Sequence, residues 1–375
     1  MPDRLIQLRD AGQSIWLDFI DRSLLNSGRL QAYIAEGWLT GQTTNPTIFE
    51  KALAEGHEYD EQLVSLPRSL TAAGVFEVVE TEDVRAACDL FAGVYEATAG
   101  EDGFVSIEVS PALAEDADAT IAEARRLWQA VDRPNVMVKV PGTVAGARAV
   151  RQLISEGINV NITLLFALTA YERVIQAYMG GLEERVRAGQ PIDRVASVAS
   201  FFVSRVDSEV DKRLDTLAAH AIGREKDRIL ELRGKAAIAN AKLAYRLFCA
   251  ELKSARWRAL AEQGARCQRP LWASTSTKNP AYRDVVYVEE LIGPHTVNTL
   301  PPQTVDAFRD HGEVRQCVTE GLDQAQRTLA ELEALGISLA EVTDKLLAEG
   351  VASFQKSFDQ LTAGLEKKLS SLVEA

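Results

Sequence analysis

A lysine inside a hydrophobic strand is the first residue of this sequence that could do chemistry. Lys139 lies in residues 135–143, NVMVKVPGT, where three β-branched valines favour a strand and Pro141-Gly142 ends it. An ammonium group there either reaches water from an edge strand or occupies a functional site. In a functional site, we expect burial to lower the pKa of the amine so that it can attack a carbonyl carbon and form a Schiff base. This segment alone leaves both interpretations open.

Polar residues late in other strand-like segments could assist such an amine. Asp18 and Glu108 could divide the proton transfers of imine formation and of carbon–carbon bond cleavage. Asn45 and Thr163 could orient a substrate hydroxyl or a water molecule. The structural alternative is a hydrogen-bonded polar belt or a buried ion pair between a lysine and a carboxylate. Five such residues in successive strands favour an active site.

Two later segments could bind an anion. Residues 200–205, SFFVSR, include Ser200 and Arg205 and lie just before a predicted helix. At the N-terminus of that helix, backbone N–H groups and the Arg205 guanidinium could hold a phosphate together. Residues 274–280, STSTKNP, supply hydroxyls and a cation, including Ser276 and Lys278. The alternatives are a surface ion pair of Arg205 with Asp207 or Glu209, and a capped turn in the second segment.

These residues are predicted to be positioned by strands that alternate with helices. The predicted strands are residues 14–20, 41–49, 103–110, 135–143, 158–166, 195–203, 269–275 and 295–300. Most are followed by a helical segment, which is typical of parallel βαβ units. Because one face of several strands is polar, a closed (β/α)8 TIM-type barrel with a polar interior is favoured. An open doubly wound sheet is the alternative, but no glycine-rich dinucleotide or Walker-type loop follows any strand.

Additional helices extend this barrel. We predict one α/β domain over residues 1–375, with a helical insertion at about 205–268 and a helical C-terminal tail at about 320–375. Residues 24–37 and 236–260 also show helical patterns, the second with little to interrupt it. An apolar stripe in the tail is predicted to pack on the core rather than on a partner. It consists of Phe354, Phe358, Leu361 and Leu365.

The composition limits the classes of partner. The chain has 375 residues, 46% of them hydrophobic and 25% charged, and a formal net charge of −13, which argues against nucleic acid or an anionic membrane as the main partner. A phosphorylated small molecule needs only a local basic pocket and stays possible. The four cysteines form no CxxC motif or Cys/His cluster, so neither disulfides nor a metal site are expected. Without an apolar segment for export or membrane insertion, we expect a cytoplasmic protein.

Seven short motifs, in this order, make the chain resemble the transaldolases, specifically their longer bacterial type. They are WLDF at 16–19, TTNP at 43–46, SIEV at 106–109, VKVPGT at 138–143, NITLLF at 161–166, SFFVSR at 200–205 and WASTS at 272–276. The resemblance implies an α/β barrel whose fourth strand carries the Schiff-base lysine, at the position of Lys139. It implies no cofactor and no metal.

The resemblance also implies a reaction. A dihydroxyacetone unit would pass from a ketose phosphate, sedoheptulose 7-phosphate or fructose 6-phosphate, to glyceraldehyde 3-phosphate or erythrose 4-phosphate, in the non-oxidative pentose phosphate pathway. Asp18 resembles the acid/base of the carbon–carbon step, and Glu108 and Thr163 resemble the pair that holds the water of imine formation. Asn45 resembles a ligand of the donor hydroxyls. Relatives occur as monomers and homodimers.

One segment departs from the family pattern. Ser200 and Arg205 resemble phosphate contacts, but many relatives also place an arginine on the seventh strand, where this sequence reads STSTKN. Ser276 or Lys278 could replace it. Two alternative functions stay open: a class I aldolase that releases the three-carbon unit to water, and a non-catalytic barrel that binds sugar phosphates.

Overall fold

The strands of the chain form one closed parallel barrel. A computed structural model describes residues 3–44, 49, 52–53 and 56–374, and in it each strand pairs with the next, while the last pairs with the first. The strands are β1 (Gln13–Asp18), β2 (Leu39–Thr43), β3 (Val105–Glu108), β4 (Val136–Pro141), β5 (Val160–Leu165), β6 (Ser197–Phe202), β7 (Arg269–Ala273) and β8 (Thr296–Leu300). The predicted α/β barrel is confirmed. Every strand is shorter than predicted, although β1 begins one residue and β2 two residues earlier than predicted, and residues 45–48 of the predicted second strand lie outside the described residues.

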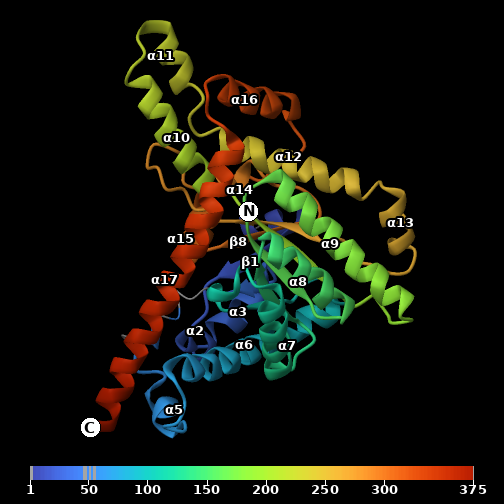
Figure 1. Cartoon of the computed structure of the whole chain (residues 1–375), viewed down its shortest axis with the longest axis vertical. Helices are drawn as coiled ribbons and strands as arrows, with labels where there is room; N and C mark the ends of the chain where they lie inside the picture. The colour runs from blue at the N-terminus through green and yellow to red at the C-terminus, as the bar shows by residue number, and fades with distance from the viewer. Residues whose placement is uncertain (1–2, 45–48, 50–51, 54–55, 375) are drawn as a thin grey trace.

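Helices surround the barrel and extend it (Figure 1). Those before β6 are α1 (Arg4–Asp10), α2 (Arg22–Asn26), α3 (Arg29–Ala35), α5 (Asp60–Ser65), α6 (Ala72–Ala97), the 3-10 helix η1 (Pro111–Leu113), α7 (Ala117–Val131), α8 (Val144–Ser155) and α9 (Leu168–Arg187). Those between β6 and β8 are α10 (Ser204–Ala218), α11 (Gly223–Leu230), α12 (Ala236–Glu251), α13 (Ala255–Ala261) and α14 (Val286–Glu289). Those after β8 are α15 (Pro302–His311), α16 (Leu322–Ala334) and α17 (Leu339–Glu374). None of the described helices is both long enough and apolar enough to cross a membrane.

Polar side chains fill part of the barrel interior and hydrogen-bond to one another. At the amino ends of the strands, Asn298 Nδ2 donates to Gln13 Oε1 at 3.2 Å, and Gln13 Nε2 donates to Thr296 Oγ1 at 3.1 Å. All three side chains are fully buried. Because these partners replace water, the polar inner faces are compatible with a packed barrel. This explains why strands that are buried on both faces read as alternating in the sequence.

Two predicted helical segments are interrupted. The segment predicted at 24–37 is divided into α2 and α3, because Gly28 adopts a left-handed conformation with φ of 74°, which a continuous helix excludes. In the segment at 236–260, α12 ends at Glu251 and a second helix, α13, follows. The Ser254 hydroxyl caps the first turn of α13 by accepting a hydrogen bond from the Trp257 N–H at 3.0 Å. The hydrophobic periodicity continues across both breaks, so it concealed them.

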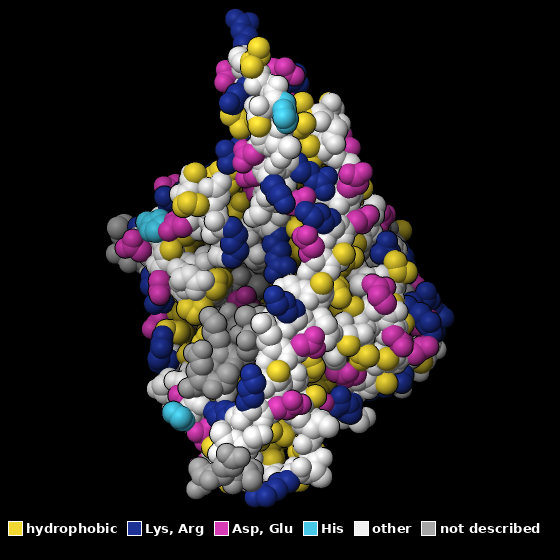
Figure 2. Space-filling view, turned by 60° about the vertical axis from the view of Figure 1, so that its left-hand side comes forward, with side chains coloured by type: hydrophobic (Ala, Val, Ile, Leu, Met, Phe, Trp, Pro, Cys, Tyr) yellow, Lys and Arg dark blue, Asp and Glu magenta, His cyan; other side chains and the backbone are white. Residues whose placement is uncertain are grey.

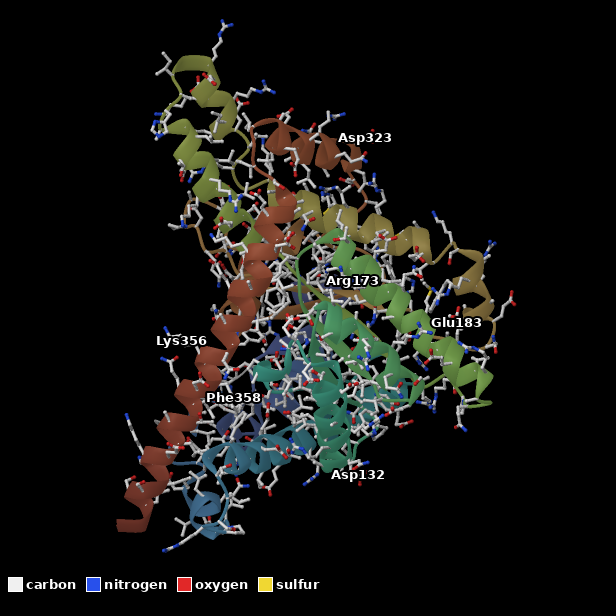
Figure 3. The ribbon with its side chains drawn as sticks, viewed as in Figure 1. Asp132, Arg173, Glu183, Asp323, Lys356 and Phe358 are labelled. Atoms are coloured by element: carbon white, nitrogen blue, oxygen red, sulfur yellow. The ribbon has the colours of Figure 1, made fainter. Side chains whose placement is uncertain are left out.

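The C-terminal helix α17 crosses the molecule from α10 at one end to α5 at the other (Figure 1). Its predicted apolar stripe is largely core: Leu361 and Leu365 are buried, and the Phe358 ring meets the Phe76 ring of α6 at 6.0 Å. Figure 3 shows Phe358 on the side of α17 that faces the barrel and Lys356 on the outer side. Phe354 is half-buried and lines a cavity instead.

Candidate active site

A cavity of about 1070 Å³ opens where the strands end at their carboxyl termini. Figure 2 shows a hollow on this face of the molecule with Lys and Arg side chains on its border. The predicted site residues among those that line the cavity are Asp18, Lys139, Thr163, Ser200, Arg205, Ser276 and Lys278. Asn45 lies outside the described residues.

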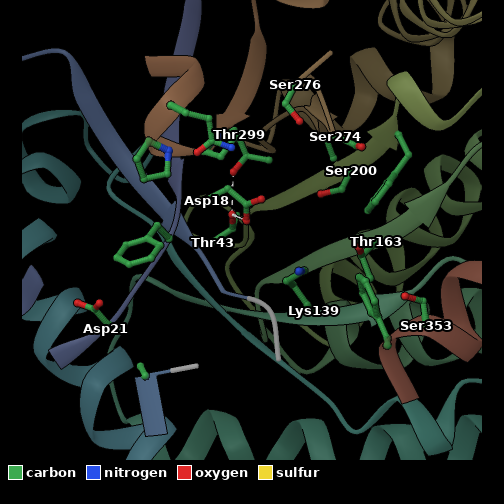
Figure 4. Close-up of a pocket in the computed structure, with 18 of the residues that line it drawn as sticks. Asp18, Asp21, Thr43, Lys139, Thr163, Ser200, Ser274, Ser276, Thr299 and Ser353 are labelled. Atoms are coloured by element: carbon green, nitrogen blue, oxygen red, sulfur yellow. Dashed lines mark hydrogen bonds between the residues drawn. The ribbon is translucent and has the colours of Figure 1, made fainter. Parts of the chain in front are cut away.

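Lys139 stands on β4 and points into this cavity. Its side chain is 8% exposed, and its Nζ donates hydrogen bonds to the Thr44 carbonyl oxygen at 2.9 Å and to Glu108 Oε2 at 3.1 Å. Figure 4 shows the amine between Asp18 and Thr163. The edge-strand alternative is wrong, because β4 pairs with a strand on each side. The lysine is therefore buried, ion-paired and directed toward the space where a ligand would bind.

Glu108 contacts the same amine from the neighbouring strand. The parallel register places Glu108 of β3 directly beside Lys139, but the carboxyl does not line the large cavity. It lines a smaller cavity of about 250 Å³ together with Glu80 and Glu123. Burial raises the pKa of Glu108 above its ordinary value, although the charge of Lys139 opposes this shift. A raised pKa makes this carboxyl a stronger proton acceptor than an exposed glutamate, which suits a group that takes and returns protons.

Asp18 ends β1 on the opposite side of the cavity mouth. Its Oδ1 accepts a hydrogen bond from the Thr43 hydroxyl at 2.9 Å, and Thr43 Oγ1 is 2.7 Å from Thr299 Oγ1. Because the Thr43 hydroxyl donates its hydrogen bond to Asp18, the Thr299 hydroxyl is the donor in the bond between the two threonines. These two hydrogen bonds fix one oxygen of the half-buried carboxylate, and no described side chain donates a hydrogen bond to the other, which a ligand can therefore reach.

Thr163, Asn161 and Ser200 form the wall next to Lys139. Thr163 Oγ1 is fully buried and has no hydrogen-bond partner among the described residues, so it can bind a water molecule or a substrate oxygen. Ser200 donates to Asn161 Oδ1 at 2.6 Å, and Asn161 Nδ2 donates to Ser106 Oγ at 3.0 Å. The Ser200 hydroxyl is therefore oriented by the interior network, with its lone pairs free to accept.

Two cations lie at the rim of the cavity without a carboxylate partner among the described residues. Neither Arg205, the second residue of α10, nor Lys278 makes an ion pair with a described residue, and Lys278 Nζ donates to Ser276 Oγ at 2.8 Å. Burial lowers the pKa of both groups, and the charge of Arg205 lowers that of Lys278 further. The alternative ion pairs of Arg205 are not formed: Asp207 accepts from Ala237 N–H and Tyr287 O–H, and Glu209 binds Arg213 and Lys345. Two such cations favour an anion as their ligand.

Several lining residues were not predicted as site residues. Thr43 and Thr299 orient Asp18, and Ser274 Oγ lies 3.0 Å from Ser204 Oγ beside the rim. Thr43 belongs to the TTNP motif and Ser274 to the WASTS motif, so both could have been found from the sequence. Phe354 was assigned to the core, because its helical spacing shows that it is covered but not which residues cover it.

The buried Glu80 of α6, behind Glu108, predicts a pH dependence of stability. Burial raises its pKa well above the ordinary 4.5, and the charge of Glu108 raises it further. A raised folded-state pKa gives stability that is complete below the unfolded-state pKa and is lost as the pH rises through the folded-state pKa. Replacing Glu80 with glutamine is therefore expected to reduce the loss of Tm between pH 5 and pH 8, measured by differential scanning calorimetry.

The matched control is Glu96→Gln, which changes an exposed carboxylate on the same helix. This variant is expected to lose Tm with rising pH as steeply as the wild type. An equal slope for wild type and Glu80→Gln would show that Glu80 does not carry this dependence.

Comparisons with known proteins identify the family of the chain. The family model described as "Transaldolase/Fructose-6-phosphate aldolase" matches residues 15–365. A transaldolase of Acidothermus cellulolyticus is 48% identical over 98% of both chains, and transaldolase 1 of Streptomyces coelicolor is 49% identical over 98% of this chain and 95% of its own. A transaldolase of Thermobifida fusca is 47% identical over 99% of this chain and its full length. The chain belongs to the transaldolase/fructose-6-phosphate aldolase family of enzymes.

Proposed function

We propose that this protein is a transaldolase that moves a dihydroxyacetone unit between sugar phosphates through a Schiff base on Lys139. The observation that carries the proposal is a buried lysine amine at one end of the cavity and, at its rim, two cations that pair with no described carboxylate. The amine suits covalent bonding to a carbonyl carbon, and the cations suit a phosphate. The donors would be sedoheptulose 7-phosphate or fructose 6-phosphate, and the acceptors glyceraldehyde 3-phosphate or erythrose 4-phosphate.

The first half of the reaction forms the imine. The Lys139 amine attacks the C2 carbonyl of the ketose phosphate, and a proton reaches the departing oxygen so that water leaves the carbinolamine. Glu108, 3.1 Å from Nζ and with a raised pKa, takes and returns protons in this step. Thr163 holds the water with its unpartnered hydroxyl.

The second half breaks and remakes a carbon–carbon bond. Asp18 takes the proton of the C4 hydroxyl, the C3–C4 bond breaks, and its electrons move to the protonated imine to give an enamine. The aldose phosphate leaves and the acceptor aldehyde takes its place. The enamine carbon attacks the aldehyde, and Asp18 returns its proton to the new hydroxyl. Water then adds to the imine of the product, the C–N bond breaks, and the new ketose phosphate leaves with the Lys139 amine regenerated. Asn45 is assigned to the donor hydroxyls from the TTNP motif.

The phosphate is assigned to Arg205, Ser276 and Lys278. In this assignment Lys278 replaces the seventh-strand arginine of many relatives, with Ser276 as its hydrogen-bond partner. Ser200 lies deeper, since its side chain is buried and held by Asn161. It would contact the sugar chain or the inner side of the phosphate.

Arg205→Ala is expected to raise KM for a phosphorylated donor by about 10- to 100-fold, the loss of one or two charge-assisted hydrogen bonds. The effect should nearly vanish with fructose, which lacks the phosphate. Steady-state kinetics with fructose 6-phosphate and with fructose measure the difference. Arg213→Ala, on the same helix but outside the cavity, is the matched control and should leave both KM values near the wild type. Equal losses with both donors would contradict the phosphate assignment.

The function itself is tested by giving the enzyme a ketose phosphate with and without an acceptor aldose phosphate. A transaldolase releases aldose phosphate rapidly only when the acceptor is present. Free dihydroxyacetone formed at full rate without acceptor would instead show an aldolase, the second activity in the family's name.

The proposal also includes the pathway, the compartment and the partners of the enzyme. The reaction would belong to the non-oxidative pentose phosphate pathway in the cytoplasm, without a cofactor or metal, by a monomer or homodimer that binds neither nucleic acid nor membrane. The described residues contain no group of three or more His, Cys, Asp or Glu side chains arranged to hold a metal ion.

A further inference from the structure

An aromatic ring from the C-terminal helix lies beside the proposed nucleophile, and the reaction steps above do not use it. The centre of the Phe354 ring is 5.9 Å from Lys139 Nζ, and the half-buried ring lines the cavity together with its neighbour Ser353. Figure 4 shows Ser353 beside Thr163, on the side of the amine opposite Asp18. The tail of the chain therefore supplies one wall of the space around Nζ.

Close packing holds this wall in place. Gly350, one turn before Phe354, packs so closely on β5 that an added Cβ would lie 2.9 Å from the Leu164 side chain, next to Thr163. Lys345 Nζ binds Glu209 of α10 at 2.5 Å, and Lys368 Nζ binds Asp60 of α5 at 2.7 Å. With ion pairs on both sides and Leu361 buried between them, α17 holds the ring in a fixed position rather than as an open lid.

The ring stands where a competing reaction would begin. Once the aldose phosphate has left, the three-carbon unit is an enamine bonded to Lys139 Nζ. If its carbon takes a proton from water, the enamine becomes an imine. A water oxygen then adds to the imine carbon and the C–N bond breaks, which releases dihydroxyacetone and the free amine. The water consumed balances the water lost when the imine formed, so this hydrolysis needs no further reactant.

We propose that Phe354 keeps bulk water away from the Lys139 side of the enamine, apart from the one water site at Thr163, and so directs the three-carbon unit to the acceptor aldehyde. The inference rests on the proposed transaldolase function. An apolar wall beside a reactive intermediate suppresses its hydrolysis by removing solvent. The face of the ring also stabilises the cationic imine by a cation–π interaction. Phe354 acts by shaping the environment of Lys139 and takes no part in bond making, so it is a positioning residue.

The test is the partition of the three-carbon unit between transfer and hydrolysis. Wild type and Phe354→Ala are each given fructose 6-phosphate at several concentrations of erythrose 4-phosphate, and sedoheptulose 7-phosphate and free dihydroxyacetone are measured. We expect the ratio of hydrolysis to transfer to rise by about tenfold in Phe354→Ala, which corresponds to about 1.4 kcal/mol between the two barriers. Phe354→Leu, which keeps an apolar wall, is expected to restore most of the wild-type ratio.

The matched control is Phe358→Ala, one turn further along α17. Phe358 packs on Phe76 and lines the smaller cavity beside Glu108 rather than the large one, so its loss loosens the helix without removing the wall. An unchanged ratio in Phe354→Ala, or an equal rise in Phe358→Ala, would overturn the proposal. A failure of the proposed function is distinguishable, because the wild type would then form no sedoheptulose 7-phosphate at all.

Discussion

Lys139→Met is expected to lower kcat for transfer by at least about a thousandfold, because it removes the amine that bonds to the substrate. Methionine fills nearly the same volume in the strand and has no amine. The rate is measured as formation of sedoheptulose 7-phosphate from fructose 6-phosphate and erythrose 4-phosphate. A variant that keeps wild-type turnover would rule out the Schiff-base mechanism.

The substitution also leaves Glu108 buried without its ion-pair partner. Breaking a buried pair in this way costs about 3–5 kcal/mol unless the carboxyl takes up a proton. The double variant Lys139→Met/Glu108→Gln removes the unpaired charge and is expected to recover the wild-type Tm without recovering activity. Lys242→Met is the matched control: Lys242 is also buried and paired, with Glu290 at 3.1 Å, but lies outside the cavity. It is expected to keep its activity.

Asp18→Asn is expected to lower kcat by about 10²- to 10⁴-fold, the usual contribution of a general acid/base. The amide keeps the shape of the side chain and can still accept the Thr43 hydrogen bond, but it cannot take the proton of the C4 hydroxyl. Imine formation at Lys139 should persist, so the variant should still be trapped by borohydride in the presence of donor.

The control for this variant is Asp21→Asn. Asp21 also lines the cavity, but its side chain caps α2 through the Leu24 N–H, and asparagine can keep that bond. Turnover should change little. If Asp18→Asn retained normal cleavage, or if it lost the borohydride adduct, its assignment to the carbon–carbon step would be wrong.

The barrel could be predicted because its physical causes are local. Strands such as β3 and β5 alternate polar and apolar residues, and Pro141, the last residue of β4, together with Gly142 marks where that strand ends. Eight such strands separated by helices permit few arrangements, and the polar inner faces favour closure. The pairing of Glu108 with Lys139 then follows from the parallel register.

Features that depend on tertiary contacts were not predictable in this way. The helical pattern of the tail shows that Phe354, Phe358, Leu361 and Leu365 share one face, but only the path of α17 places Phe354 at Lys139 and Phe358 at Phe76. The break at Gly28 depends on a backbone conformation that glycine permits but does not require. The sequence also left open whether Arg205 forms an ion pair. The answer depends on tertiary contacts, because Asp207 and Glu209 bind other partners in the fold.

The central claim is that Lys139 forms an imine with the donor, and borohydride trapping tests it most directly. Sodium borohydride reduces the imine to a stable amine, so the protein incubated with fructose 6-phosphate should gain one covalently bound sugar or three-carbon unit. Peptide mass spectrometry is expected to locate it on Lys139 in the wild type, with none in Lys139→Met and an unchanged adduct in Lys242→Met. An adduct on another lysine, or none on a wild-type enzyme that turns over its substrate, would contradict the claim.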